Sequence, residues 1–231
     1  MIALVTVTDN NYCLYTQVLL QSLSGLGVKE KMFVIQSGLE AAHREALKKL
    51  YSNIEFLEAD YEMYKSKGKD LAKFYKFEMF KLRGFEKIVF IDSDILFIKS
   101  PQEFFDKGLA EFNFAMIREN HRDCYNSGLI VIDKKYLTDE TYMSLVDYPW
   151  DEREFGKDQQ IFNKKFEGAI QRLPVKYNWF ANEMPPDIAE IVGLHYINKN
   201  FTEIDSKRIP KFLHEVWFNV YNEAMRRLKC E

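Results

Sequence analysis

Lys87-Ile88-Val89-Phe90-Ile91-Asp92-Ser93-Asp94 is the stretch of sequence that decides the fold. The residues from Ile88 to Ile91 are apolar and mostly β-branched, which predicts a buried strand. The strand leads directly into the acidic triplet Asp92-Ser93-Asp94, after which the chain becomes apolar again. In open α/β sheets, ligands bind beyond the carboxyl ends of the strands, so acidic side chains at this position indicate a ligand site.

The residues before this strand alternate between strand and helix patterns. Short apolar, β-branched runs predict strands, and apolar residues at helical spacing predict helices. Strands are expected at 2–7, 32–35 and 54–57, and helices at 12–26, 40–51 and 71–83. This order predicts a parallel sheet with helices on its faces, which is an α/β fold.

The residues after the acidic triplet continue the α/β pattern less regularly. Further strands are expected at 112–117, 128–132 and 192–196, and helices around 104–105 and at 137–146, 157–166 and 209–228. We find no repeat and no low-complexity linker in the sequence. A single domain over residues 1–231 is therefore predicted.

Composition excludes several classes of protein. The 231 residues carry a net charge of −3, which argues against a basic nucleic-acid binder, and only 10 are glycines, which argues against a glycine-rich phosphate loop. Cys13, Cys124 and Cys230 lie far apart, so neither a cysteine zinc site nor a disulfide framework is expected. Residues 1–5 lack a basic segment, and no apolar run is long enough for a membrane span. A cytoplasmic protein is expected, with a peripheral role at a membrane left open.

Asp92 and Asp94 are candidate metal ligands. In extended chain, residues two apart point to the same side, so these carboxylates should converge. They would repel each other unless a positive group lies between them, and a divalent cation with oxygen ligands fits. The alternative is an acidic turn without a ligand.

The segment Val89–Leu96 resembles the metal-binding D-x-D segment of the retaining nucleotide-sugar glycosyltransferases of family 8, which include glycogenin and bacterial lipopolysaccharide galactosyl- and glucosyltransferases. Other segments resemble that family in the same order along the chain: 5–12, 71–75, 125–132, 156–163 and 192–196. The resemblance implies a GT-A fold, with a Rossmann-like mixed, mostly parallel sheet flanked by helices. It further implies a nucleotide-binding part at about 1–100 and an acceptor part at about 101–231.

The resemblance also implies the ligands of the site. Asp92, Asp94 and His195 would hold a divalent cation, Mn²⁺ in the first place and Mg²⁺ as the alternative. The donor would be UDP-glucose or UDP-galactose. Its contacts are expected from Thr6, Thr8, Asp9, Tyr12, Lys73, Asp92, Ser93, Asn126, Ser127 and Lys199.

One departure from the family pattern concerns the residues after His195. The family's glycine and lysine positions there hold Asn198 and Phe201, so Lys199 is the candidate replacement for the lysine that clamps the diphosphate. This departure leaves open a non-catalytic or degenerate nucleotide-sugar binding domain. A sugar nucleotidyltransferase is a further alternative, but the polar run Thr8–Tyr12 stands where that class has a glycine-rich basic loop.

Asp158 and Gln159 are the expected catalytic residues. Asp158 would accept hydrogen bonds from sugar hydroxyls, and Gln159 would lie near the anomeric carbon. Because a neutral glutamine is a poor nucleophile, we favour front-face attack with dipolar stabilisation by Gln159 over a covalent intermediate. Each site residue also has an ordinary structural alternative: a helix cap for Asp158, core packing for His195 and Tyr12, a solvated lysine for Lys73, and a turn for Asn126-Ser127.

The acceptor is expected to be a glycan, glycolipid or glycoprotein. Aromatic rings suit the apolar faces of sugars, so Tyr177, Trp179 and Phe180 are candidates for its site, with core packing as the alternative. The sequence is also compatible with a homodimer. It does not identify the acceptor, the donor sugar or the linkage.

Overall fold

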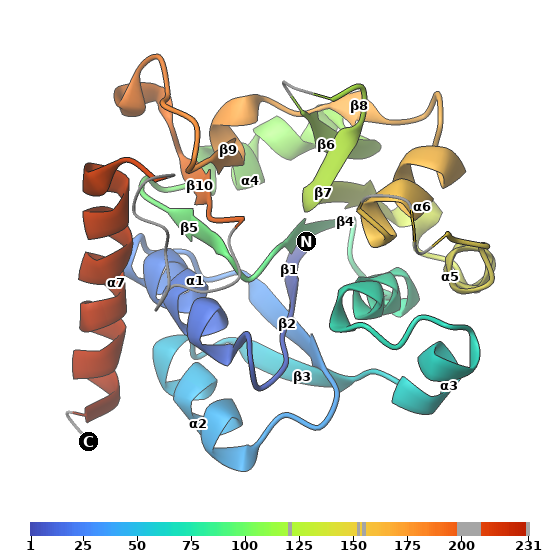
Figure 1. The fold of residues 1–231 in the computed structure, drawn as a ribbon, viewed down its shortest axis with the longest axis horizontal. Helices are drawn as coiled ribbons and strands as arrows, with labels where there is room; N and C mark the ends of the chain where they lie inside the picture. The colour runs from blue at the N-terminus through green and yellow to red at the C-terminus, as the bar shows by residue number, and fades with distance from the viewer. Residues whose placement is uncertain (120–121, 152, 154–155, 198–208, 230–231) are drawn as a thin grey trace.

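The computed structural model describes residues 1–119, 122–151, 153, 156–197 and 209–229, and Figure 1 shows their fold. A seven-stranded sheet runs through the molecule in the order β3-β2-β1-β4-β7-β6-β8. Its strands are β1 (Ile2–Val7), β2 (Lys31–Gln36), β3 (Ile54–Glu58), β4 (Lys87–Ile91), β6 (Phe114–Arg118), β7 (Tyr125–Asp133) and β8 (Gln171–Arg172).

The direction of the strands is mixed and mostly parallel. β1 pairs in parallel with β2 and β4, β2 with β3, and β6 with β8. β7 lies antiparallel to both of its neighbours, β4 and β6. The predicted fold class is therefore confirmed. Because β7 runs the opposite way, its first residues lie beside the carboxyl end of β4.

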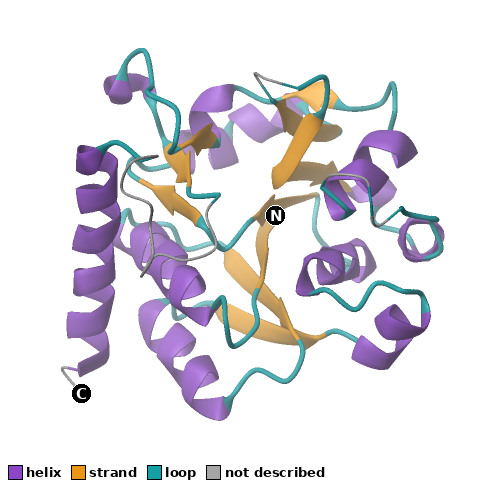
Figure 2. Ribbon diagram, in the orientation of Figure 1, coloured by secondary structure: helices purple, strands orange, loops and turns teal. Residues whose placement is uncertain are grey.

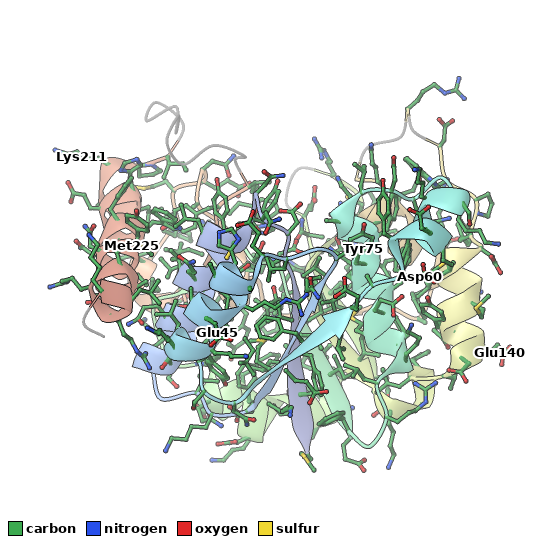
Figure 3. The ribbon with its side chains drawn as sticks, turned by 90° about the horizontal axis from the view of Figure 1, so that it is seen from below. Glu45, Asp60, Tyr75, Glu140, Lys211 and Met225 are labelled. Atoms are coloured by element: carbon green, nitrogen blue, oxygen red, sulfur yellow. The ribbon has the colours of Figure 1, made fainter. Side chains whose placement is uncertain are left out.

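Helices cover both faces of this sheet. One core layer packs Leu4, Val89 and Ile91 against α1 (Cys13–Gly25), α2 (Ala41–Leu50) and α4 (Gln102–Asp106). The other packs Val5 and Phe90 against the 3₁₀ helix η1 (Ala72–Lys81), α3 (Tyr61–Ser66), α5 (Asp139–Val146) and α6 (Asp158–Lys165). In Figure 3, Glu45 of α2 lies on one flank and Glu140 of α5 on the other. Burial on both faces explains why the central strands β1 and β4 are largely apolar.

A second, three-stranded sheet lies beside the main sheet, and Figure 2 shows its short strands. It consists of β5 (Ile95–Phe97), β9 (Trp179–Phe180) and β10 (Gly193–His195) in the order β5-β10-β9. Leu96 and Leu194 pack it against α1 and α7 (Lys211–Lys229). Its register pairs His195 with Ile95, which places the histidine next to the acidic triplet. The remaining short 3₁₀ turns are η2 (Gly108–Glu111), η3 (Lys134–Tyr136), η4 (Val175–Tyr177) and η5 (Ile188–Glu190).

Several local features of the structure differ from the sequence-based prediction. The helix expected at 71–83 is a 3₁₀ helix, and every residue from Phe74 to Phe80 in it is buried, so it has no amphipathic face to give a helical period. The six-residue α3 was not predicted, although Asp60 caps it by accepting a hydrogen bond from the Met63 amide. β7 begins at Tyr125, three residues before the strand expected at 128–132. Within the described ranges, no helix has both the length and the apolarity needed to cross a bilayer.

Candidate active site

The acidic triplet forms a tight turn between β4 and β5. The Ile95 amide donates a hydrogen bond to the Asp92 carbonyl at 3.1 Å, and Ser93 is buried between the two acids. The expectation of an extended chain at this point is therefore wrong. The carboxylates nevertheless converge, because the turn brings them together and the Tyr196 amide holds the Asp94 carbonyl at 2.9 Å. Candidate ligand atoms of Asp92, Asp94 and His195 all lie within 4.8 Å of one another.

His195 reaches this turn from β10 of the second sheet. Its Nε2 lies 3.2 Å from Asp94 Oδ1, and only 4% of the residue is exposed. Its Nδ1 has no hydrogen-bond partner among the described residues. Burial would lower the pKa of the imidazole, but the neighbouring carboxylates of Asp94 and Asp92 outweigh this effect and raise it. The ring is thus positioned by packing and by Asp94.

The composition of this cluster fits a divalent cation. It offers two hard carboxylate donors and one imidazole nitrogen, a set that Mn²⁺ accepts and Mg²⁺ uses less readily. Burial raises the pKa of Asp92, and the nearby carboxylate of Asp94 adds to the effect, while Lys76 and His195 oppose it. A bound cation between Asp92 and Asp94 would therefore relieve the repulsion between these two carboxylates.

Lys76 is the buried cation of the site. It lies on η1 with a side chain that is 3% exposed, and its Nζ is 2.8 Å from Asp158 Oδ2 and 3.2 Å from Asp92 Oδ1. The Ser127 hydroxyl, 3.3 Å from the same Nζ, donates to Asp158 Oδ2 at 2.8 Å. Burial would lower the pKa of Lys76, but the two carboxylates raise it. Lys76 thereby connects the acidic turn Asp92–Asp94 to the start of α6.

Sequence reasoning missed Lys76 and chose Lys73 from the same segment. Lys73 is exposed at the surface end of η1. In a 3₁₀ helix, residues three apart share a side and differ by one turn, about 6 Å along the axis. Lys73 therefore lies on the same side of η1 as Lys76, one turn further from the carboxylates of Asp158 and Asp92.

Gln159 and Asn126 lie side by side next to this ion pair. Asn126 Nδ2 donates to Gln159 Oε1 at 3.2 Å, and the Ser127 amide donates to the same oxygen at 3.3 Å. Gln159 Nε2 donates to Glu119 Oε1 at 3.0 Å. The structure thus brings Asn126, Ser127, Asp158 and Gln159 together, and it adds Glu119.

The predicted nucleotide contacts lie where β1 ends. Thr6 is fully buried and its hydroxyl has no hydrogen-bond partner among the described residues, whereas the Thr8 hydroxyl accepts from Thr16 at 2.8 Å. Asp9 accepts a hydrogen bond from the Tyr12 amide at 2.8 Å. Burial raises the pKa of Tyr12 to about 12, and Asp94 adds to this, so the phenol lies near the acidic turn. Lys199 lies outside the described residues.

The aromatic residues proposed for the acceptor have different surroundings. Tyr177 stacks on Phe104 with ring centroids 4.2 Å apart and belongs to the core. Trp179 Nε1 donates to the Glu183 carbonyl at 2.8 Å. Phe180 meets the His195 ring edge-on at 5.6 Å, which places it nearest to the site.

Comparison with protein families finds one that matches most of the chain. The model of glycosyl transferase family 8 matches residues 3–207. Glycogenin-1 of Caenorhabditis elegans is 27% identical over 192 residues, and glycogenin-2 of Homo sapiens is 27% identical over 199 residues. These alignments cover 75% and 79% of this chain but 42% and 38% of the glycogenins, so the chain spans about two fifths of the length of these relatives.

Solved structures of glycosyltransferases have the same fold. The galactosyltransferase LgtC, solved with donor and acceptor sugar analogues, matches with a TM-score of 0.74 and 15% identity over 96% of this chain and 95% of its own. The glycosyltransferase GlyE of Streptococcus pneumoniae matches with a TM-score of 0.76 and 18% identity over 98% of this chain and 62% of its own. The GT-A fold predicted from the sequence is thereby confirmed.

Proposed function

Because the chain belongs to glycosyl transferase family 8, we propose that it is a metal-dependent, retaining glycosyltransferase. It transfers a hexose from UDP-glucose or UDP-galactose to a glycan, glycolipid or glycoprotein acceptor. The observation that carries the proposal is the convergence of Asp92, Asp94 and His195 within 4.8 Å, beside the Lys76–Asp158 ion pair.

The acidic turn Asp92–Asp94 is proposed to bind the donor diphosphate through a divalent cation, Mn²⁺ or Mg²⁺. When bound, the cation acts as a Lewis acid that offsets the charge of the departing nucleoside diphosphate. Asp92, Asp94 and His195 would hold it. Thr6, Thr8, Asp9 and Tyr12 would contact the nucleoside from the end of β1.

The sugar is proposed to lie against Asn126, Ser127, Asp158 and Gln159. Their amide, hydroxyl and carboxylate groups can donate to and accept from sugar hydroxyls. The Asp158 carboxylate is held by Lys76 at 2.8 Å and by the Ser127 hydroxyl at 2.8 Å. A carboxylate neutralised in this way is a weak nucleophile, which supports attack without a covalent intermediate.

Front-face attack accounts for retention of configuration. The acceptor oxygen forms its bond to the anomeric carbon on the face from which the diphosphate oxygen leaves, and the acceptor proton passes to the leaving diphosphate. The Gln159 amide, fixed by its neighbours, stabilises the positive charge that develops on the sugar ring.

We propose that two parts of one domain bind the two substrates. Residues of about 1–100 bind the nucleotide, and residues of about 101–231 bind the acceptor, with Trp179 and Phe180 near its site. We further propose a cytoplasmic enzyme that acts alone or as a homodimer.

Thermal unfolding with ligands tests this proposal. We expect Mn²⁺ with UDP-glucose or UDP-galactose to raise the melting temperature, because a ligand that binds only the folded state stabilises it by mass action. Release of UDP in the presence of an acceptor mixture then reports turnover. Asp94→Asn should abolish both effects, whereas Glu45→Gln, on the exposed face of α2, should abolish neither. A donor that binds tightly but is never turned over would indicate a non-catalytic binding domain.

A further inference from the structure

Four polar side chains beside the proposed sugar site form a continuous hydrogen-bonded chain. Asn178 Nδ2 donates to Asn126 Oδ1 at 3.0 Å, Asn126 Nδ2 donates to Gln159 Oε1 at 3.2 Å, and Gln159 Nε2 donates to Glu119 Oε1 at 3.0 Å. All the donors in this chain point the same way, from Asn178 towards Glu119. Neither Asn178 nor Glu119 belongs to the set of residues expected from the sequence.

We propose that Glu119 and Asn178 are positioning residues that fix the direction in which Gln159 presents its amide to the sugar. This inference rests on the proposed glycosyltransferase function. Neither residue needs to touch the substrate, because each acts through the amide next to it.

The direction of these hydrogen bonds is determined by neighbouring groups that can only donate or only accept. The Glu119 carboxylate only accepts, so Gln159 must turn its Nε2 towards it. The Ser127 amide only donates, and it meets Gln159 Oε1 at 3.3 Å. The Gly128 amide likewise only donates, and it meets Asn126 Oδ1 at 2.8 Å. Reversing either amide would set oxygen against oxygen and N–H against N–H.

Burial makes this direction costly to change. Asn126 is 8% exposed, Gln159 7% and Asn178 1%, and the Glu119 side chain is 8% exposed. A buried amide that lost its partners would have little water to replace them. The loss of these hydrogen bonds would therefore lower the free energy of unfolding by the full desolvation cost of the amide. The Gln159 dipole is therefore set before the substrate arrives, which is the condition for efficient electrostatic stabilisation.

Asn178 indicates that the hydrogen-bonded side chains have a role besides stabilising the fold. Its Nδ2 donates to Asn126, but its Oδ1 is buried and has no hydrogen-bond partner among the described residues. A buried group left unsatisfied costs free energy of folding. An apolar residue would avoid that cost, so we infer that the amide is retained for the hydrogen bond that it gives to Asn126.

Two isosteric substitutions and their combination test the proposal. Asn178→Asp places an acceptor against Asn126 Oδ1, and Glu119→Gln replaces an obligatory acceptor by a group that also donates. We expect each single variant to lower kcat about tenfold while the donor KM changes less than about threefold. Glu223→Gln, on the exposed side of α7, is the matched control and should change neither.

The double variant separates orientation from stability. With a carboxylate at 178 and an amide at 119, the Asn126 and Gln159 side chains can reverse together and regain the hydrogen bonds among the four side chains, while the Ser127 and Gly128 amides lose the acceptor oxygens that they meet in the wild type. We expect its melting temperature to lie above that of Asn178→Asp while kcat stays low, because the Gln159 dipole is then reversed. Recovery of kcat together with the melting temperature would overturn the inference, as would normal kcat in both single variants.

The melting temperatures also keep the test independent of turnover. If the wild-type chain turns over no donor, the proposed function fails, but the positive coupling between positions 119 and 178 in thermal unfolding is still expected. If Asn178→Asp does not fold, Glu119→Gln alone decides: a wild-type kcat in that variant overturns the inference.

Discussion

His195 packs directly against the backbone of Gly128. A Cβ atom on Gly128 would lie 2.6 Å from His195 Cε1 and 2.8 Å from Asn126 Oδ1, closer than real Cβ atoms approach their neighbours. Gly128 belongs to β7 of the large sheet, whereas His195 belongs to β10 of the small one. Because Gly128 has no side chain, His195 of the small sheet can lie against the Asn126–Gly128 segment of the large sheet.

Substitution of Gly128 by alanine should therefore damage both the metal site and the sugar site. We expect Gly128→Ala to weaken Mn²⁺ binding at least about tenfold and to destabilise the fold by about 1–3 kcal/mol through overpacking. Calorimetric titration with Mn²⁺ and thermal unfolding measure the two effects. Gly25→Ala is the control, since a Cβ at Gly25 meets nothing within 4 Å. Normal Mn²⁺ affinity in Gly128→Ala would show that His195 is not a ligand.

Lys76 should matter far more to stability than Lys73. Lys76→Met leaves the buried carboxylate of Asp158 and the partly buried carboxylate of Asp92 without their cation, which we expect to cost about 3–5 kcal/mol. Lys73→Met alters an exposed position and should change stability by less than about 0.5 kcal/mol. Urea unfolding compares the two. If donor affinity falls in Lys73→Met and not in Lys76→Met, the donor contact expected from the sequence is the better one.

The stabilisation that Mn²⁺ gives should grow with pH. The pKa values of His195 and Asp92 are raised in the folded protein, so the stability they contribute without metal is present at low pH and lost as pH rises through those raised values. Metal binding needs the neutral imidazole and the ionised carboxylate. Between about pH 6 and pH 9, the melting-temperature gain with Mn²⁺ should therefore increase. His195→Gln should flatten this increase, and an equally steep rise in that variant would contradict the assignment.

Most of the fold could be predicted because its strands and longer helices carry strong local patterns. The strand at 87–91 and the α-β alternation before it follow from apolar runs separated by polar turns. Where the local signal was imprecise, burial was the cause: η1 is buried without interruption from Phe74 to Phe80, so its sequence pattern does not distinguish a 3₁₀ helix from an α-helix. β9 consists of Trp179 and Phe180 alone and depends on pairing with β10, which lies beyond the reach of a local pattern.

The candidate site was predictable in its motifs and less so in the contacts between them. The acidic pair was found from its position after a buried strand, whereas His195 and the segments around Asn126 and Gln159 were found through resemblance, and the fold brings them together. Lys76, Glu119 and Asn178 were missed because none of them lies in a motif. Asn178 did leave a signal, since it stands as one amide within the aromatic run Tyr177-Asn178-Trp179-Phe180.

No covalent sugar adduct should form on Asp158. The Lys76 ammonium and the Ser127 hydroxyl already neutralise its carboxylate, and Gln159 beside it carries no charge. Intact-protein mass spectrometry after incubation with a 2-fluoro UDP-sugar and Mn²⁺ should therefore show the unmodified mass. A hexosyl adduct that maps to Asp158 would replace front-face attack by a two-step displacement.

The β5–β10 pairing joins two segments of the candidate metal site that lie far apart in the sequence. Asp94 and His195 lie in distant parts of the sequence, and the pairing that unites them must close a long loop. Because non-local contacts are slow to form, we expect the three candidate ligands to come together late in folding. A bound cation would link β5 and β10 in the folded protein. The rate at which refolding protein binds the cation would therefore report when this pairing forms.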